Sequence, residues 1–249
     1  MQTRRHLLSV PLTRRGRAAL RAQTLLEESV VRASVLPDRP VYDTGAFPWA
    51  AEVAADWKAI RAELDAVLVH RERMPSFHEI IKEVSTITTD DQWKTFFLIS
   101  AGHRCEENAR RCPQTMQALQ KIPDVCTAFF SILSPGKHIP AHRGAYNGVL
   151  RFHLGLLVPE PQERCRIRIG NEIHSWREGE ALIFDDSFNH EVWNDTDGYR
   201  AVLFVDFARP LHKPWHWLNR SLLNLAPLAP FLREAGARQK RWEKMFYNN

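Results

Sequence analysis

Short apolar runs separated by turn-forming residues dominate the second half of the chain. Glycine, asparagine, aspartate and proline lie between these runs and supply the turns that connect short strands. Six runs are predicted to be β-strands: 126–133, 149–158, 165–169, 181–184, 190–193 and 201–207. Strands of this length and spacing favour an antiparallel sandwich or barrel over a parallel α/β sheet, and the jelly roll is the first candidate.

One of these runs, 149–158, alternates between apolar and polar side chains. Leu150 and Phe152 share one face of the predicted strand, whereas Arg151 and His153 share the other. Burying the two polar side chains would cost several kcal/mol without an anionic partner. Two interpretations stay open: this face is exposed to solvent, or it lines an interior that receives an anion.

Helical spacing is typical of the first half of the chain. Apolar residues three and four apart predict a helix over 50–69, and a second helix is predicted over 113–121, where a proline supplies the start signal. Residues 36–49 contain several turn formers and are predicted to be a linker. Residues 1–35 are rich in arginine with scattered leucine and valine, and they predict a basic amphipathic helix.

The tail that follows Pro210 mixes tryptophan, leucine and basic residues. The favoured interpretation is a pair of helices that packs onto the barrel, because an apolar face on a terminal helix usually belongs to a core. The alternative is a segment that lies at a membrane surface.

The composition is that of a globular protein. The 249 residues are 44% hydrophobic and 25% charged, which excludes collagen-like and wholly disordered chains. A transmembrane helix is not expected, and the apolar stretch near the N-terminus is too short for a secretory signal. The four cysteines lack the spacing of a zinc site and predict reduced thiols in a cytoplasmic protein, whereas a bridge between Cys105 and Cys112 would require an oxidising compartment.

The net charge of +5 and the pI of about 9.2 are compatible with three kinds of anionic partner. These are nucleic acid, a membrane surface and a small anionic substrate. The basic residues are dispersed and lack the interleaved aromatic side chains that single-strand binding uses. No nucleic-acid partner is therefore expected.

Two histidines, His142 and His190, are expected to lie on separate strands. Neutral imidazoles suit ferrous iron, and two of them from opposed strands can bind one face of the metal. In the facial triad of non-haem Fe(II) oxygenases a carboxylate ligand comes two residues after the first histidine, but here that place is Gly144. Arg200, at the start of the last predicted strand, can hold a carboxylate through two parallel hydrogen bonds.

The stretch 92–211 resembles the aspartyl/asparaginyl β-hydroxylase family of Fe(II)- and 2-oxoglutarate-dependent oxygenases. The matching pieces, which are specific as an ordered set, are QWKTFFL, CPQTMQALQKIP, FSILSPGKHIPAHRGAYNGVLRFHLGLLVP and CRIRIGNEIHSWREGEALIFDDSFNHEVWNDTDGYRAVLFVDFARP. The resemblance implies a mainly β fold, the double-stranded β-helix or distorted jelly roll, with flanking α-helices at the N- and C-termini.

The resemblance also suggests how the chain is divided. We expect a basic N-terminal arm and linker over 1–45, a 2-oxoglutarate oxygenase domain over 46–211 and a C-terminal helical tail over 212–249. Within the oxygenase domain, a helical lead-in over 46–125 is expected to precede the β-barrel core over 126–211.

The family's metal ligands match His142 and His190 in this sequence. The vertebrate member of the family also has a glycine at the place of Gly144, so the resemblance implies a two-histidine iron site with water in the vacant position. Asp185 and Asp186, shortly before the second histidine, are interpreted as a turn-forming pair, with orientation of a ligand imidazole as the alternative.

The family's co-substrate residues match four further positions. Arg200 and Ser131 match the residues that hold the distal carboxylate of 2-oxoglutarate, and Arg151 and His153 match the pair near its metal-chelating end. The resemblance places Trp93 and Lys94 near a substrate groove, and a core position for the tryptophan competes equally. Four other histidines are predicted to be surface or structural residues: His138, His174, His212 and His216.

The reaction implied by the resemblance uses Fe(II), 2-oxoglutarate and O2. Decarboxylation of 2-oxoglutarate to succinate and CO2 accompanies hydroxylation of an unactivated C–H bond. Two other functions stay open. The missing carboxylate leaves room for chloride in a halogenase, and a non-catalytic barrel would only bind a ligand.

The substrate is predicted from the family and from the ends of the chain. Family members hydroxylate Asp or Asn side chains in peptides, whereas bacterial relatives hydroxylate acyl chains of membrane lipids. The basic N-terminus, Trp215, Trp217 and the leucine-rich tail favour a lipid acyl chain and peripheral attachment to the inner face of a membrane. A peptide or a free amino acid is the alternative substrate.

Overall fold

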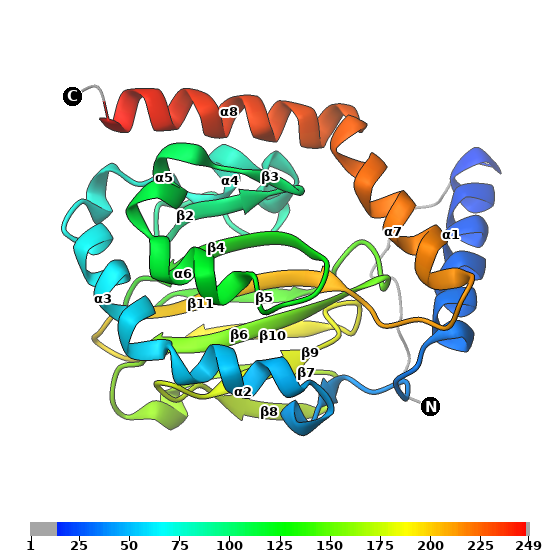
Figure 1. Ribbon diagram of the computed structural model, residues 1–249, viewed down its shortest axis with the longest axis horizontal. Helices are drawn as coiled ribbons and strands as arrows, with labels where there is room; N and C mark the ends of the chain where they lie inside the picture. The colour runs from blue at the N-terminus through cyan, green and yellow to red at the C-terminus, as the bar shows by residue number, and fades with distance from the viewer. Residues whose placement is uncertain (1–13, 248–249) are drawn as a thin grey trace.

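The computed structural model describes residues 14–247 and contains two antiparallel β-sheets that face each other (Figure 1). The seven-stranded sheet has the order β1-β9-β6-β11-β4-β2-β3, and the four-stranded sheet has the order β5-β10-β7-β8. The strands are β1 (Val41–Tyr42), β2 (Trp93–Ser100), β3 (His103–Arg104), β4 (Val125–Leu133), β5 (His138–His142), β6 (Val149–Leu157), β7 (Cys165–Ile169), β8 (Glu172–Ser175), β9 (Ala181–Phe184), β10 (His190–Asn194) and β11 (Arg200–Ala208).

The chain alternates between the two sheets from β4 to β11. It passes from β4 in the large sheet to β5 in the small one, back to β6, then to β7 and β8, to β9, to β10 and finally to β11. This winding is that of a double-stranded β-helix, so the predicted fold class is confirmed. All six predicted strands are present, with bounds that differ by at most one residue.

Helices flank the sheets, and none of those within residues 14–247 is both long and apolar enough to cross a membrane. They are α1 (Arg14–Ala33), α2 (Pro48–Ala55), α3 (Trp57–Leu68), α4 (Phe77–Ile80), α5 (Glu106–Arg111), α6 (Pro113–Leu119), α7 (Trp215–Leu225) and α8 (Pro230–Tyr247). The predicted helix over 50–69 is thus two helices, because the first one ends at Ala55 and Asp56 separates it from the second.

The segment predicted to be a linker is part of the fold. Strand β1 pairs with β9, and Tyr42 and Phe47 are buried in the main apolar core. The ring of Phe47 packs edge-on against Phe207 at 5.8 Å between centroids. The turn formers of this segment therefore shape a packed connection, and the linker prediction for 36–49 is wrong.

The two faces of β6 are both covered, which settles the open question about its alternation. Its neighbours are β11 and β9, and its apolar face packs against the helical layer, as in the 5.4 Å contact between the rings of Trp49 and Phe152. Its polar face turns to the space between the sheets, where His153 is only 4% exposed. Exposure of this face to solvent is therefore excluded.

The terminal helices behave differently from one another. Helix α8 buries Trp242 and Phe246 against the core, as the favoured interpretation of the tail predicts. Helix α7 buries Asn219 but leaves a run of apolar side chains exposed. Helix α1 confirms the helical prediction from Arg14 onward, and residues 1–13 of that prediction lie outside the described part of the chain.

One buried ion pair joins three distant segments beside the open end of the barrel. The guanidinium of Arg209 pairs with Asp185, and neither side chain is exposed to solvent. Arg209 also donates to the carbonyl oxygen of Asn147 (2.6 Å) and to the hydroxyl of Tyr42 (3.0 Å).

We expect Arg209→Leu to lower the free energy of unfolding by about 3–5 kcal/mol, because it leaves Asp185 as a buried carboxylate without its cation. Urea unfolding followed by circular dichroism measures the change. The exposed Arg177→Leu is the control and should stay within about 0.5 kcal/mol of the wild type. An Arg209→Leu midpoint equal to that of the control would contradict this role for the ion pair.

Candidate active site

The two predicted metal-binding histidines lie side by side in the small sheet. His142 ends β5 and His190 begins β10, and the two residues are direct partners in the antiparallel register. Their ring centroids are 4.1 Å apart, with an angle of 55° between the ring planes. Antiparallel pairing thus brings together two residues that are far apart in the sequence.

Each imidazole is held in one tautomer by a backbone carbonyl two residues earlier. Nδ1 of His142 donates to Pro140 (2.8 Å), and Nδ1 of His190 donates to Phe188 (3.0 Å). Burial lowers the pKa of His142 to about 4 and that of His190 well below its usual value. Both rings are therefore neutral at physiological pH, and Nε2 carries the lone pair that a metal ion needs.

The place of the missing carboxylate ligand is filled by a carboxylate from another loop. A Cβ atom on Gly144 would lie 2.2 Å from Oδ2 of Asp186, and the Gly144 amide donates to the Asp186 carbonyl oxygen at 2.7 Å. Asp186 is buried and pairs with Arg151 at 2.8 Å, and burial raises the pKa of its carboxyl to about 7. Within residues 14–247, however, no three His, Cys, Asp or Glu side chains form a ready metal cluster. Within the described residues, the histidine pair is thus the group that could hold a metal ion.

The turn interpretation of the aspartate pair is confirmed for Asp185, whose side chain accepts a hydrogen bond from the Ser187 amide at 3.0 Å. Both aspartates also pair with arginines, which the sequence did not indicate.

We expect Gly144→Ala to lower the free energy of unfolding by about 1–3 kcal/mol, because the new methyl group must displace the buried Asp186 carboxylate. Thermal unfolding measures the loss. Gly236→Ala in α8 is the matched control, since nothing lies within 4 Å of its new methyl group. Replacing Asp186 by glycine in the Gly144→Ala background should abolish the steric part of the loss. If the losses of stability from the two substitutions were instead additive, the clash would be refuted.

Arg200 carries a buried positive charge deep in the barrel. Its side chain is 2% exposed and lies over the ring of Trp176 at 4.4 Å. Nε and Nη1 have no hydrogen-bond partner within the described residues, and burial lowers the pKa of the guanidinium to about 10, with the Cys165 thiol beside it. A buried cation in this state needs an anion from outside the chain.

Ser131 lies on the neighbouring strand β4, opposite Val202, which is two residues beyond Arg200. Its hydroxyl accepts a hydrogen bond of 3.0 Å from the indole nitrogen of Trp93. Trp93 is buried, so the core interpretation of this tryptophan is confirmed. Its indole also orients the serine that the sequence analysis singled out.

His153 occupies the middle of the interior. Its ring lies 4.9 Å from Phe204 and 5.0 Å from Phe184, and both ring nitrogens lack a partner within the described residues. Burial and the charge of Arg200 lower its pKa well below the usual range. A neutral imidazole next to an unpaired guanidinium makes this part of the barrel suitable for an anion with further hydrogen-bonding groups.

Arg151 differs from Arg200 because two carboxylates neutralise it. Nε donates to Asp206 at 2.9 Å, and a terminal nitrogen pairs with Asp186. Asp206 was missed from the sequence, although it lies on the inward face of β11 at the position opposite Arg151. The alternation that begins at Arg200 would have identified it. Among the described residues, Arg200 is therefore the cation of the interior that has no carboxylate partner.

The interior thus combines the parts that Fe(II) and 2-oxoglutarate require. Two neutral imidazoles with free Nε2 atoms suit a ferrous ion. A buried guanidinium with unused donors suits the distal carboxylate of 2-oxoglutarate. The residue types and their hydrogen-bonding states fit both groups.

Several known hydroxylases are similar to this chain. Residues 54–210 match the family model of the aspartyl/asparaginyl beta-hydroxylases. The chain is 55% identical to the ornithine lipid ester-linked acyl 2-hydroxylase of Rhizobium tropici over 212 residues, which cover 85% of this chain and 75% of that protein. It is 35% identical to the human aspartyl/asparaginyl beta-hydroxylase over 173 residues, which cover 68% of this chain but only 22% of the human protein.

Among solved structures, a prolyl-4-hydroxylase of Pseudomonas putida aligns with 64% of this chain and 98% of its own, at 19% identity and a TM-score of 0.40. The family match spans more than half of the chain, and the bacterial relative is matched over most of its length. The chain therefore belongs to the aspartyl/asparaginyl β-hydroxylase family.

Proposed function

We propose that the protein is an Fe(II)- and 2-oxoglutarate-dependent hydroxylase that acts on an acyl chain of a membrane lipid. The observation that carries the proposal is the 55% identity to a protein named for hydroxylation of an ester-linked acyl chain of ornithine lipid. The human relative, named for aspartyl and asparaginyl hydroxylation, is 35% identical. The difference in identity favours the lipid, and the 2-position of an ester-linked chain is the first carbon to examine.

In this proposal His142 and His190 would hold the iron through Nε2, and Arg200 with Ser131 would hold the distal carboxylate of 2-oxoglutarate. His153 would donate or accept hydrogen bonds near the metal-chelating end of the co-substrate. Arg151 would lie near the same end of the co-substrate, where its ion pairs with Asp186 and Asp206 would hold it in position.

The iron, once bound, supplies the activation of O2 that the side chains cannot perform. Overall, one oxygen atom of O2 enters the substrate C–H bond as hydroxyl and the other enters succinate, while CO2 leaves. Two electrons come from the decarboxylation of 2-oxoglutarate and two from the C–H bond.

The chain contributes orientation and exclusion of water. The carbonyl oxygens of Pro140 and Phe188 fix the imidazole tautomers. The aromatic rings of Phe184 and Phe204 surround His153 and keep the interior apolar except for the groups that bind the co-substrate. Binding of a carboxylate at Arg200 is favourable in such a site because water does not compete for the guanidinium.

The test supplies the purified protein with Fe(II), ascorbate, 2-oxoglutarate, O2 and ornithine lipid dispersed in detergent. Mass spectrometry is expected to find a lipid that has gained one oxygen atom, in equal amount to succinate. Oxygen gain by an Asp- or Asn-containing peptide, with the lipid unchanged, would instead support the peptide substrate.

Two further outcomes would overturn the proposed chemistry. Gain of chlorine in the presence of chloride would support the halogenase. Absence of succinate with both lipid and peptide substrates would favour a barrel that only binds ligands.

A further inference from the structure

Exposed apolar side chains gather on the two terminal helical segments. Fourteen large apolar side chains are exposed within the described residues, and ten of them lie in residues 25–35 and 215–231. Clusters of this kind mark interaction surfaces, because exposed apolar residues on a protein free in water are usually scattered singly. The cluster therefore needs a partner.

Helix α7 has an inner side toward the barrel and an apolar outer side. On the inner side, the Asn219 amide donates to the Gly148 carbonyl oxygen and its oxygen accepts from the Tyr146 hydroxyl, both at 2.8 Å. The outer side carries exposed apolar residues at helical spacing, and the exposed apolar surface continues to the start of α8: Trp215, Leu218, Leu222, Leu225, Leu228 and Phe231. We call these six residues the outer face.

The charged residues in the segment that bears the outer face are basic. No acidic residue occurs between Lys213 and Arg233 in the sequence, and the one cation between them, Arg220, pairs with Asp124 at 3.3 Å on the side of the barrel. The ammonium of Lys213 lies 5.2 Å from the ring centre of Trp217, which is itself 57% exposed. Tryptophans beside cations are typical of side chains at a bilayer interface.

The whole positive excess of the protein lies in its terminal segments. Residues 1–35 contain seven arginines and two glutamates, and residues 212–249 contain seven Lys or Arg and two glutamates. Residues 36–211 therefore carry a net charge of −5, although the chain as a whole carries +5. Attraction to an anionic surface would act on the two ends of the chain.

These two segments meet at one end of the molecule. Helices α1 and α7 lie close together beside the sheets (Figure 1), and the His212 amide donates to the Ala33 carbonyl oxygen at 2.8 Å. Helix α1 is tied to the loop after β5 by the ion pair of Glu27 with Arg143 at 2.7 Å. That loop follows His142 directly, so both helices flank the end of the barrel where the histidines lie.

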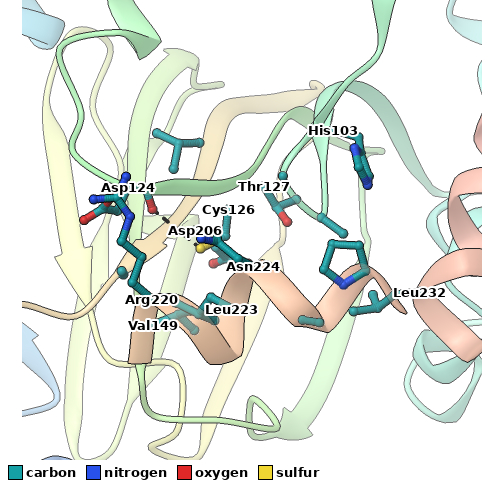
Figure 2. A pocket seen from close by; sticks show the side chains of 16 residues that line it. His103, Asp124, Cys126, Thr127, Val149, Asp206, Arg220, Leu223, Asn224 and Leu232 are labelled. Carbon is teal, nitrogen blue, oxygen red and sulfur yellow. Dashed lines mark hydrogen bonds and ion pairs between the residues drawn. The ribbon is translucent and has the colours of Figure 1, made fainter. Parts of the chain in front are cut away.

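A cavity of about 500 Å³ separates α7 from the rim of the large sheet. Thr127, Val149 and Asp206 line it from the strands, and Leu223 lines it from α7 (Figure 2). Asp206 is the residue that pairs with Arg151 inside the barrel. The helix that bears the outer face thus also forms a wall of a cavity at the barrel rim.

We propose that the outer face docks on an anionic lipid bilayer and that the cavity behind α7 admits the acyl chain from it. This inference deepens the proposed function and rests on it, because an acyl chain would enter the cavity only if the substrate is a lipid. The apolar side chains of α7 enter the interface, while Lys213 and Arg233 lie at the level of the headgroups.

A second copy of the chain fits the outer face less well than a bilayer does. A two-fold interface would place the same patch on itself, and Lys213 and Arg233 would then lie near their own copies, with no acidic residue between them in the sequence to offset the repulsion. An anionic bilayer would both bury the apolar side chains and attract the positive charge.

The test measures binding to vesicles and needs no turnover. The full-length protein is sedimented with phosphatidylcholine vesicles that contain or lack phosphatidylglycerol. The docking variant is Leu218→Gln, Leu222→Gln, Leu225→Gln. The control variant changes three apolar residues elsewhere that are at least as exposed: Val69→Gln, Ile173→Gln and Met245→Gln.

We expect the wild type and the control variant to bind the anionic vesicles, and the docking variant to bind at least about tenfold more weakly. Raising the salt concentration should weaken wild-type binding. Turnover of detergent-dispersed lipid, assayed separately, should be retained by the docking variant, so a failure of the proposed reaction is distinguishable from a failure of docking.

Three results would overturn the inference. The wild type could fail to bind anionic vesicles, or the docking and control variants could lose equal amounts of vesicle binding. Alternatively, the wild type could be a dimer that binds no vesicles and that the docking substitutions convert to a monomer.

Discussion

Replacing His190 by alanine is expected to abolish iron binding and to lower hydroxylation by at least about 1000-fold. The site offers two imidazoles and no third ligating side chain in the described residues, so one substitution leaves a single protein ligand. Loss of an outer partner of a metal ligand already costs about 10–100-fold, and loss of a ligand itself costs more. His142→Ala should have the same effect, because the two rings are neighbours and are held in the same tautomer.

Calorimetric titration with Mn²⁺ under anaerobic conditions measures metal binding separately from turnover. His138→Ala is the matched control, since His138 begins β5, the strand that His142 ends, stacks on Trp193 at 5.5 Å and pairs with Glu191 outside the barrel. Retention of wild-type metal affinity by His190→Ala would show that the metal lies elsewhere.

Most strands with a strong apolar pattern were predictable. Strand β11 is buried along nearly all of its length, and its apolar run indicated its bounds within one residue. Strand β2 was missed although its residues are buried from Trp93 to Leu98. The apolar pattern did not give the bounds of β5, because Ile139 is its one fully buried residue and Pro140 interrupts the run. Edge strands with one buried side chain leave little periodicity to detect.

The candidate site was predictable where one residue type implies one chemistry. A histidine pair, Arg200 and the glycine at position 144 could be identified from the sequence and the family resemblance. Their partners could not, since Asp186 and Asp206 reach Arg151 only after two loops and two strands have packed together. No sequence spacing encodes the contact of Asp186 with the space beside Gly144.

The tail shows a similar division. An apolar face on a terminal helix indicated packing onto the barrel, and α8 packs in this way through Trp242. The outer face of α7 has the same helical spacing but remains exposed. The spacing of apolar residues shows that a helix is amphipathic. What its apolar face contacts depends on where the preceding strand ends.

Replacing Arg200 by methionine is expected to weaken 2-oxoglutarate binding by about 100-fold or more without lowering the stability of the ligand-free protein. Truncating one partner of a buried charge pair costs about 2–5 kcal/mol, and each 1.4 kcal/mol is a factor of about ten in Kd. In the ligand-free protein, however, the guanidinium is buried with unused donors, so methionine removes an uncompensated charge and keeps the volume. Affinity and stability should therefore change in different directions.

Thermal unfolding with and without 2-oxoglutarate measures both quantities in one experiment. The wild type should gain stability as the co-substrate concentration exceeds its Kd, whereas Arg200→Met should start at an equal or higher midpoint and gain little. Arg200→Lys should fall between them, because an ammonium keeps the charge but cannot form two parallel hydrogen bonds. Arg168→Met, which changes an arginine paired with Glu191 outside the barrel, controls for loss of charge alone. If Arg200→Met still gained stability from 2-oxoglutarate as the wild type does, the distal carboxylate would have to bind at another cation, and the unused donors of Arg200 would need a different anion.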